Sequence, residues 1–169
     1  MLRLVLLVLA VIGLSSPAFA AQPSLFDGMF KKSSVSKASL SFGSPRSVDG
    51  PVSITVDLTT QVMKVSSEGR TIYTFDVSTG RKGYTTPTGN YRPIRMHKMW
   101  YSSKYENSPM PHSIFFYGGY AIHGTGDIKN LGDVASHGCV RLHPDNAEKL
   151  FALVKQVGMK NTKITLIRS

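Results

Sequence analysis

Residues 135–142 read ASHGCVRL and contain Cys139, the only cysteine in the 169-residue chain. His137 lies two positions before it, and His123 lies 16 positions before it in the segment AIHGTG (121–126). A free thiol has a pKa of about 8.5, so it is mostly protonated at neutral pH and weakly nucleophilic. A nearby imidazole can take that proton, stabilise the thiolate as an ion pair and return the proton to a leaving amine. The pattern therefore predicts a nucleophilic cysteine with a histidine as its base.

Two other interpretations of this cysteine stay open on the residues alone. Cysteine is often a small, buried and inert residue. His137, Cys139 and His143 are also all metal-ligand types, which would suit a metal-dependent peptidase. Structural zinc sites usually carry paired Cys or His at short spacing, whereas this chain has a single Cys. We therefore expect no metal and no cofactor.

The segment SHGCVRL (136–142), preceded by AIHGTG, resembles the L,D-transpeptidase family, whose catalytic domain is called YkuD-type. Two further segments look like the same family, TPTGNY (86–91) and MPHSIFFYGGYAIHGTG (110–126). The resemblance covers about residues 51–169. It implies a mostly β fold, a β-sandwich of mixed sheets with one main α-helix near the C-terminus.

Two features depart from the family pattern. Only twelve residues (124–135) separate His123 from Ser136, fewer than the family's commonly quoted spacer. Arg141 also stands where that pattern has Asn after the apolar residue. Because the Ser-His-Gly-Cys core is intact, we interpret both departures as the mark of a subgroup.

The resemblance implies a role for each matching residue. Cys139 is the nucleophile, and His123 is the base that activates it. The backbone carbonyl of Gly124 orients the imidazole, and backbone amides of Gly138 and Cys139 form an oxyanion hole. His137 shapes the site and assists proton movement.

Three more residues are expected to contact the substrate. A planar guanidinium suits a carboxylate, so Arg141 is a candidate ligand, although a structural salt bridge is an equal alternative. Ser136 and Tyr105 complete the set. Trp100, Tyr101 and Tyr105 lie in an irregular, polar stretch, so they are candidates for a lid over the site. We expect His97, His112 and His143 on the surface or satisfied in the core.

The implied reaction is acyl transfer on peptidoglycan. The thiolate attacks the carbonyl between the third residue of a tetrapeptide stem, a diamino acid, and its D-alanine. A stem amine that accepts the acyl group gives a cross-link, and a lysine of an envelope protein gives an anchored protein. Water as acceptor gives an L,D-carboxypeptidase or cross-link hydrolase. A non-catalytic wall-binding module is a further alternative, and the resemblance also implies acylation by carbapenems.

The N-terminal residues predict export to the periplasm or cell-wall space. A basic residue precedes an apolar run (4–14), and Ala18-Phe19-Ala20 fits the small-x-small rule for signal-peptidase cleavage. The run is shorter than the roughly 18 residues that a spanning helix needs. We therefore expect a signal peptide over 1–20, a flexible linker over 21–50 and the catalytic domain over 51–169, with no transmembrane segment after cleavage.

The charge balance narrows the partners. The formal net charge is +10, without a long basic run. We expect no nucleic-acid partner for an exported protein, so an acidic wall polymer is the simplest match for a diffuse positive surface. We expect a monomer.

Hydrophobic periodicity predicts many strands and one late helix. The clearest strand begins at Val52, where apolar and polar residues alternate through Leu58. A helix is expected over 144–157, with Pro at its start and Gly158 as its stop. Further strands are expected at 61–66, 71–77, 90–96, 113–117, 120–123 and 162–167. Residues 139–142 are a short apolar segment, loops are expected at 79–88 and 127–136, and irregular structure is expected over 100–111.

Overall fold

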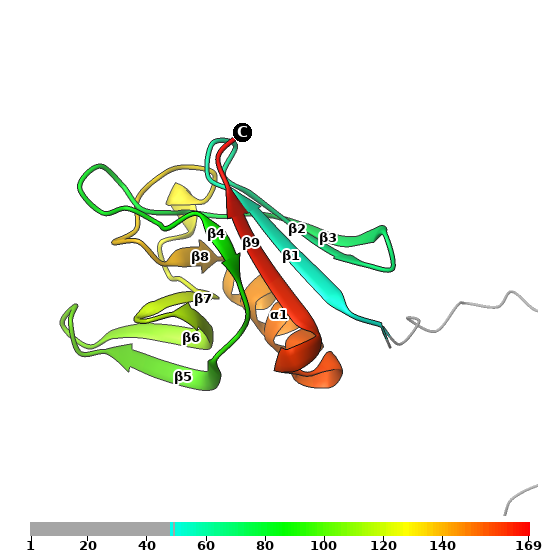
Figure 1. The fold of residues 1–169 in the computed structure, drawn as a ribbon. Coiled ribbons are helices and arrows are strands. Elements are labelled where there is room, and N and C mark those ends of the chain that lie inside the picture. Colours follow the sequence, from blue (N-terminus) through cyan, green and yellow to red (C-terminus); the bar gives the residue numbers. More distant parts are fainter. Residues whose placement is uncertain (1–47, 49) are drawn as a thin grey trace, which may run out of the picture. The chain divides into compact units, whose positions relative to one another are not determined.

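The computed structural model describes residue 48 and residues 50–169 (Figure 1). The predicted signal peptide and most of the predicted linker therefore lie outside the described residues. Val48 packs against the hydrophobic core, and its carbonyl accepts a hydrogen bond from Gln156 at 3.2 Å, so contacts of the domain begin slightly before Pro51. In the described part of the chain, no helix has the length and hydropathy needed to cross a membrane.

A five-stranded sheet has the order β3-β2-β1-β9-β4. Strand β1 pairs antiparallel with β2 but parallel with β9, the last strand of the chain, so the sheet is mixed. Val52, Ile54 and Val56 are buried while residues between them are exposed or half-buried, as the alternation predicts. The strands are β1 (Val52–Asp57), β2 (Val62–Ser67), β3 (Arg70–Asp76), β4 (Gly89–Tyr91) and β9 (Thr162–Ile167).

A four-stranded sheet has the order β5-β6-β7-β8. It is also mixed, because β7 and β8 run parallel while β5, β6 and β7 are antiparallel neighbours. The prediction of two mixed sheets with one main helix is therefore confirmed. The strands are β5 (Arg95–Ser102), β6 (Ser108–Tyr117), β7 (Tyr120–Gly124) and β8 (Val140–Leu142).

The sequence prediction was wrong for residues 90–111. The expected strand at 90–96 is divided between β4 and β5, and the expected irregular stretch is a long β5–β6 hairpin. Most side chains of β5 are exposed or half-buried, and β5 is an edge strand of its sheet. When few side chains of a strand pack against the core, apolar and polar residues need not alternate along it. The sequence of such a strand therefore resembles that of a loop.

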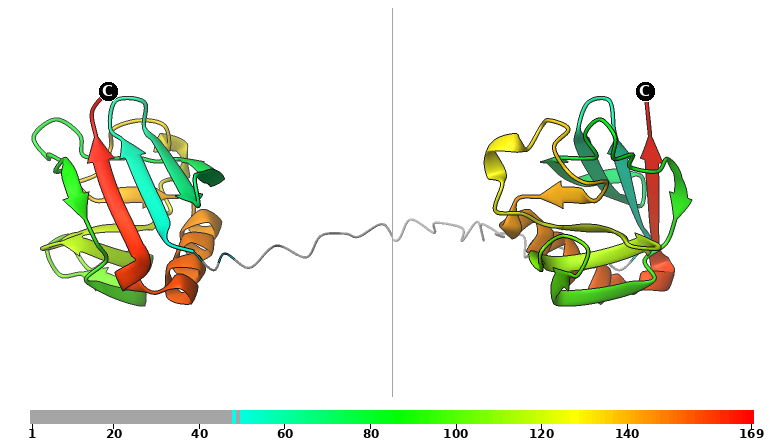
Figure 2. Two further views of the ribbon diagram at one scale, coloured as in Figure 1. Left: turned by 45° about the vertical axis from the view of Figure 1, so that its right-hand side comes forward. Right: turned by 90° about the vertical axis from the view of Figure 1, so that its left-hand side faces the viewer.

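The helix α1 (Pro144–Val157) lies beside the four-stranded sheet, where it contacts β6 and β7 (Figures 1 and 2). His143 is its N-cap and accepts a hydrogen bond from the N–H of Asp145, a role that the sequence did not predict. Gly158 ends it with φ of 89°, as expected. Its buried residues are Ala147, Leu150, Leu153 and Val154.

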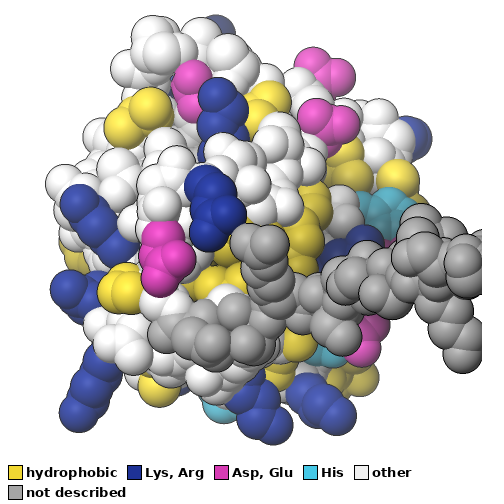
Figure 3. Space-filling model, turned by 90° about the vertical axis from the view of Figure 1, so that its right-hand side faces the viewer, with side chains coloured by type: hydrophobic (Ala, Val, Ile, Leu, Met, Phe, Trp, Pro, Cys, Tyr) yellow, Lys and Arg dark blue, Asp and Glu magenta, His cyan; other side chains and the backbone are white. Residues whose placement is uncertain are grey.

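The hydrophobic core contains side chains from both sheets and from α1. Ile54, Leu150 and Ile164 are fully buried in one cluster with residues of β6, β7 and β8. Basic side chains do not cluster on the face shown in Figure 3. Lys and Arg side chains are spread over it, with acidic side chains between them. Two short 3-10 turns, η1 (Ile128–Asn130) and η2 (Met159–Asn161), complete the described elements.

Candidate active site

Two parallel strands bring Cys139 and His123 to one cavity. In the β7–β8 register Ile122 lies opposite Val140 and His123 opposite Arg141. Cys139 directly precedes β8, so it lies beside β7 one step before the first of these pairs. Side chains two residues apart on a strand share a face, which places Cys139 and His123 on the same side of the sheet. Both line one cavity.

The imidazole of His123 is buried and held in one tautomer. Its Nδ1 donates to the backbone carbonyl of Gly124 at 2.7 Å, so Nε2 is the free acceptor. Burial lowers the pKa of His123 to about 4, with a smaller contribution from the charge of Arg141, while the Gly124 contact opposes the shift. The residue is therefore a neutral base at physiological pH.

Gly124 is constrained by packing. A Cβ at this position would lie 3.0 Å from Pro111 of β6 and 3.2 Å from Pro144 at the start of α1. A larger residue would push the first turn of the helix away from β7 and displace the carbonyl that orients His123. The glycine in AIHGTG thus couples the helix position to the orientation of the base.

Cys139 is half-buried against Met110, Phe115 and Ala121, and its Sγ donates to the carbonyl of Gly119 at 3.9 Å. Burial raises the pKa of its thiol, while the N–H of Ala121 and the charge of Arg141 oppose the shift. The raised cysteine pKa and the lowered histidine pKa both favour a neutral thiol beside a neutral imidazole. The resting pair thus differs from the ion pair that the sequence suggested.

The loop before Cys139 is folded around the hydroxyl of Ser136. This buried Oγ donates to the carbonyl of Cys139 at 2.6 Å and accepts the N–H of Gly138 at 2.9 Å. Ser136 therefore positions the loop and does not line the cavity. The N–H of Gly138 is engaged with Ser136, which revises its expected part in an oxyanion hole and leaves the N–H of Cys139 as the predicted donor.

The loop after β3 forms hydrogen bonds to the loop before Cys139 from the other side. The carbonyl of Thr79 accepts the N–H groups of Ala135 and Ser136 at 3.0 and 2.8 Å. The buried hydroxyl of Thr86 donates to the carbonyl of Gly138 at 2.8 Å. Gly138 has φ of 110°, and a Cβ there would lie 2.7 Å from the ring of Tyr120. Hydrogen bonds from the loop after β3 thus fix the position of Cys139.

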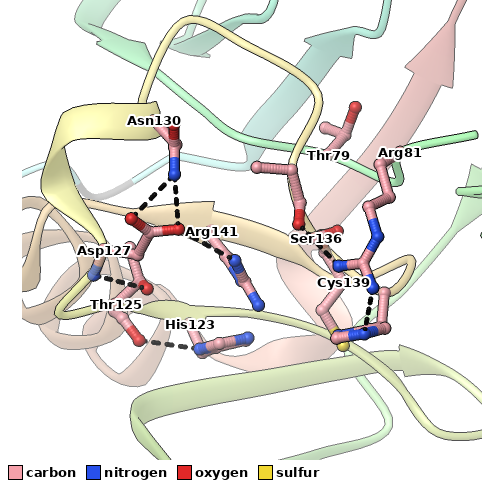
Figure 4. Close-up of polar contacts among 12 residues, drawn as sticks. Thr79, Arg81, His123, Thr125, Asp127, Asn130, Ser136, Cys139 and Arg141 are labelled. Carbon is pink, nitrogen blue, oxygen red and sulfur yellow. Dashed lines mark hydrogen bonds and ion pairs between the residues drawn. The ribbon is translucent and has the colours of Figure 1, made fainter.

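Arg141 lies in an ion pair at the opposite side of the site, between Asp127 and His123 (Figure 4). Its Nη1 is 3.5 Å from Oδ2 of Asp127, and its side chain is 20% exposed. Asn130 donates to both carboxylate oxygens of Asp127 at 2.8 Å. Arg141 also lines the cavity, so its ion pair with Asp127 leaves it at the cavity surface.

His137 is surrounded by aromatic and cationic groups. The ring of Tyr105 stacks on it at 4.5 Å, and the ring of Tyr84 meets it edge-on at 4.5 Å. Nη2 of Arg81 lies 2.7 Å from Nε2 of His137. A guanidinium can only donate, so Nε2 accepts and Nδ1 carries the proton. The contact with Arg81 therefore occupies Nε2 of His137. Only the protonated Nδ1 remains for the expected assistance to proton movement at Cys139.

The β5–β6 hairpin forms the wall over the site because β6 bends at His112. Met110 and Phe115 both line the cavity, although residues five apart on a regular strand face opposite sides. His112 has φ of 54° in this interval, and the hydroxyl of Ser113 donates to the carbonyl of Met110 at 2.6 Å across the bend. The bend turns Trp100, the partner of Met110 on β5, toward the cavity.

Two of the histidines outside the site are less satisfied than expected. His97 and His112 each have a buried ring nitrogen without a hydrogen-bond partner among the described residues. His97 packs between Trp100 and Phe115, and His112 packs on Phe151 of α1. Both rings are held by aromatic packing.

The cavity has a volume of about 580 Å³ and combines aromatic and cationic walls. Of the predicted site residues it brings together Cys139, His123, His137, Arg141 and Tyr105. Trp100 also lines it, whereas Tyr101 does not and is 57% exposed. Among the described residues, no cluster of three or more His, Cys, Asp or Glu is placed to hold a metal ion.

Sequence reasoning missed several residues of the site. Asp127 follows AIHGTG directly, and its position in that glycine-rich segment was the available signal. Arg81 lies in a loop that was recognised only by its glycines and proline. Arg95 and Lys104 of the hairpin also line the cavity and add positive charge to it.

Residues 51–165 match the model of the L,D-transpeptidase catalytic domain, YkuD. The YkuD protein of Bacillus subtilis (strain 168) is 25% identical over 152 residues, which are 88% of this chain and 83% of that protein. A solved L,D-transpeptidase from Xylanimonas cellulosilytica DSM 15894 is 29% identical with a TM-score of 0.60, covering 73% of this chain and 63% of that one.

A solved L,D-transpeptidase in complex with imipenem, LdtMt1, is similar in fold. It is 20% identical with a TM-score of 0.62, and the match covers 69% of this chain and 59% of that one. This chain thus spans less than two thirds of either solved chain. The family model covers most of the described residues, and the chain belongs to the L,D-transpeptidase (YkuD) family.

Proposed function

We propose that this protein is a peptidoglycan L,D-transpeptidase that uses Cys139 as its nucleophile and His123 as its general base. The observation that carries the proposal is the neutral, Gly124-oriented imidazole of His123 in the same cavity as the chain's single thiol. Nε2 is left as the acceptor, which is the nitrogen that a proton from Cys139 requires. A cysteine that served only as a small core residue would not need to line the cavity that also contains this imidazole.

Acylation proceeds with the thiol proton moving to Nε2 of His123 as Sγ attacks the acyl carbon of the third stem residue. The carbon–sulfur bond forms, and the oxyanion is met by the N–H of Cys139. The carbon–nitrogen bond to D-alanine then breaks as Nε2 returns the proton to the leaving amine. The products are free D-alanine and a thioester on Cys139.

Deacylation repeats the exchange with an acceptor amine. The amine attacks the thioester and passes a proton to His123, and the carbon–sulfur bond breaks. The sulfur recovers the proton, so no external co-reactant is needed. A stem amine as acceptor produces a cross-link between third residues, an envelope-protein lysine anchors that protein, and water releases a tripeptide.

Cationic side chains of the cavity support a substrate that carries carboxylates. Arg141, Arg95 and Lys104 line it, against one acidic residue, Asp127, which is already engaged with Arg141 and Asn130. We propose Arg141 as the main substrate anchor, because its charge is partly desolvated and its orientation is fixed. Tyr105 contributes an aromatic wall. Carbapenems are expected to acylate Cys139, in line with the imipenem complex of a structural relative.

The setting of the reaction follows from residues outside the described part of the chain. The signal-peptide pattern over 1–20 supports export, and cell-wall stems lie outside the cytoplasm. Detection of the mature protein in a periplasmic or wall fraction, beginning at residue 21, tests this part of the proposal. An uncleaved cytoplasmic chain would contradict it.

The proposal is tested by incubating the purified protein with disaccharide-tetrapeptide and measuring product masses. A dimer that has lost one D-alanine identifies a transpeptidase. A tripeptide monomer identifies a carboxypeptidase, and a stem joined to an added lysine peptide identifies protein anchoring. Cys139→Ala is the matched control, and product formation that persists in it would reject the cysteine mechanism.

A further inference from the structure

The tip of the β5–β6 hairpin contacts the loop before Cys139 through an aromatic stack. Its backbone N–H groups at Tyr105, Asn107 and Ser108 donate to carbonyls of Ser102 and Tyr105, within the hairpin itself. Beyond the hairpin, Tyr105 stacks on His137 with ring centroids 4.5 Å apart and an interplanar angle of 20°. The tip also lines the cavity that contains Cys139. The stack therefore determines the position of the hairpin tip relative to Cys139.

Arg81 holds the other partner of that stack. Its Nη2 lies 2.7 Å from Nε2 of His137, and its Nη1 donates to the carbonyl of Ala135 at 3.3 Å. Its guanidinium lies over the ring of Tyr84, 4.7 Å from the centroid. A planar fork can satisfy all three contacts at once, whereas a lysine could not. Arg81 does not line the cavity.

We infer that Arg81, His137 and Tyr105 form a latch that fastens the β5–β6 hairpin over Cys139, with Arg81 as a positioning residue for the acyl-transfer reaction. Arg81 fixes the ring of His137 from the loop after β3. That ring then offers its face to Tyr105 at the hairpin tip. Three segments distant in sequence are thereby joined beside the nucleophile.

The latch requires a neutral His137. Protonation would remove the acceptor at Nε2 and set a cation against the Arg81 guanidinium. Burial and nearby positive charges lower the pKa of His137, so the latch is closed at neutral pH and opens only below the ordinary range of histidine. The groups that face this ring are Arg81 and Tyr84 of the loop after β3, Tyr105 and Lys104 of the hairpin, and Arg141 of β8.

An open hairpin would affect substrate binding more than bond making. Trp100, Lys104 and Tyr105 line the cavity from β5 and the hairpin tip, whereas His123 lies on β7 and Cys139 directly precedes β8. The effect on turnover rests on the proposed function. Hairpin closure itself can be measured without substrate, because Trp100 is the only tryptophan of the chain.

The test compares Arg81→Met with Lys82→Met, the exposed neighbour whose substitution removes the same charge. Acrylamide quenching of Trp100 fluorescence reports how accessible the hairpin side of the cavity is. We expect Arg81→Met to increase quenching at pH 7.5 and Lys82→Met to behave as wild type. In wild type, quenching should rise as the pH is lowered through the depressed pKa of His137, and in Arg81→Met it should be high throughout.

Turnover supplies the second readout. Arg81→Met should raise KM for the tetrapeptide about tenfold with a smaller change in kcat, as expected when an aromatic stack and a charge-assisted hydrogen bond stop supporting the binding wall. Unchanged quenching in Arg81→Met, with unchanged pH dependence, would overturn the latch whether or not the protein is a transpeptidase.

Tyr105→Leu provides an independent variant if Arg81→Met does not fold. Tyr105 is half-buried at the hairpin tip, away from the main core, so its loss should leave the fold intact. Increased quenching that no longer depends on pH supports the latch, and wild-type quenching overturns it. Absent turnover in wild type with the expected quenching pattern would instead reject the proposed function and leave the latch standing.

Discussion

The five-stranded sheet and the surroundings of Cys139 are built in different ways. In the sheet, buried residues of β1, β2 and β9 alternate along each strand, and their burial supplies the stabilisation. Around Cys139, residues of four distant segments meet through single hydrogen bonds, one ion pair and ring stacks. Stability and reactivity therefore depend on largely separate residues, which substitutions can address one at a time.

The largest effect is expected at the base. His123→Gln should lower the acylation rate of Cys139 by about 10²–10⁴-fold, because it removes general-base catalysis. The free energy of unfolding should change little. Stopped-flow measurement of thioester formation checks the rate, and urea denaturation checks stability. His143→Gln is the control, since it removes the N-cap of α1 at a cost of about 1 kcal/mol in stability with acylation unchanged.

A core substitution should give the opposite result. Ile54→Ala should lower the free energy of unfolding by about 2–5 kcal/mol, because Ile54 is fully buried and leaves a cavity. The folded fraction should keep the wild-type acylation rate. Ser53→Ala on the same strand is the exposed control. A large rate loss in folded Ile54→Ala would show that the two regions are coupled more tightly than described.

Gly138 has a backbone conformation that favours glycine, and it directly precedes Cys139. Gly138→Ala adds a Cβ at φ of 110° and 2.7 Å from Tyr120, so it should cost about 1–3 kcal/mol in stability and also slow acylation. Gly132→Ala is matched, because Gly132 has φ of 95° but no atom within 4 Å of an added Cβ. Gly132→Ala should lose stability without a change in rate. Equal rates in both variants would contradict the role of the Gly138 contact.

The substrate anchor should have a moderate effect. Arg141→Gln should raise KM for the tetrapeptide about tenfold, the value of roughly one charge-assisted hydrogen bond. Steady-state kinetics on the stem check this. Arg70→Gln, at the exposed start of β3, removes the same charge and should leave KM unchanged. Equal effects of both substitutions would point to the overall charge instead of a specific anchor.

The smallest effect is expected from mild acidification. The pKa of His123 is lowered to about 4, so the base stays unprotonated from pH 7 to 5.5 and loses function only as the pH falls through about 4. The acid limb of kcat/KM, which reports groups of the free enzyme, should therefore lie near pH 4. A limb near the ordinary histidine pKa of about 6.5 would show that His123 is more exposed to solvent than the structure indicates.

Most strands of the five-stranded sheet could be predicted from the sequence, because the patterns that mark them lie within a few consecutive residues. Alternation from Val52 to Leu58 and the proline and glycine at the ends of α1 each act within a few residues. The edge strand β5 was missed for the same reason. Its side chains are all exposed or half-buried, so no clear periodic signal marks it.

The site was only partly accessible. Cys139 and His123 stand out by residue type and spacing, but the hydrogen bond from Gly138 to Ser136 depends on a three-dimensional turn. The contact between Arg81 and His137 joins positions 56 residues apart. The direction of the thiol pKa likewise depends on burial by Met110 and Phe115, and neither residue is near Cys139 in sequence.

The central claim is that Cys139 forms a thioester with the stem after His123 takes its proton. Intact-protein mass spectrometry after rapid mixing with disaccharide-tetrapeptide tests it most directly. We predict an adduct with the mass of the stem less D-alanine on Cys139, absent in Cys139→Ala and strongly delayed in His123→Gln. An adduct on another residue, or D-alanine release by Cys139→Ala at the wild-type rate, would contradict the claim.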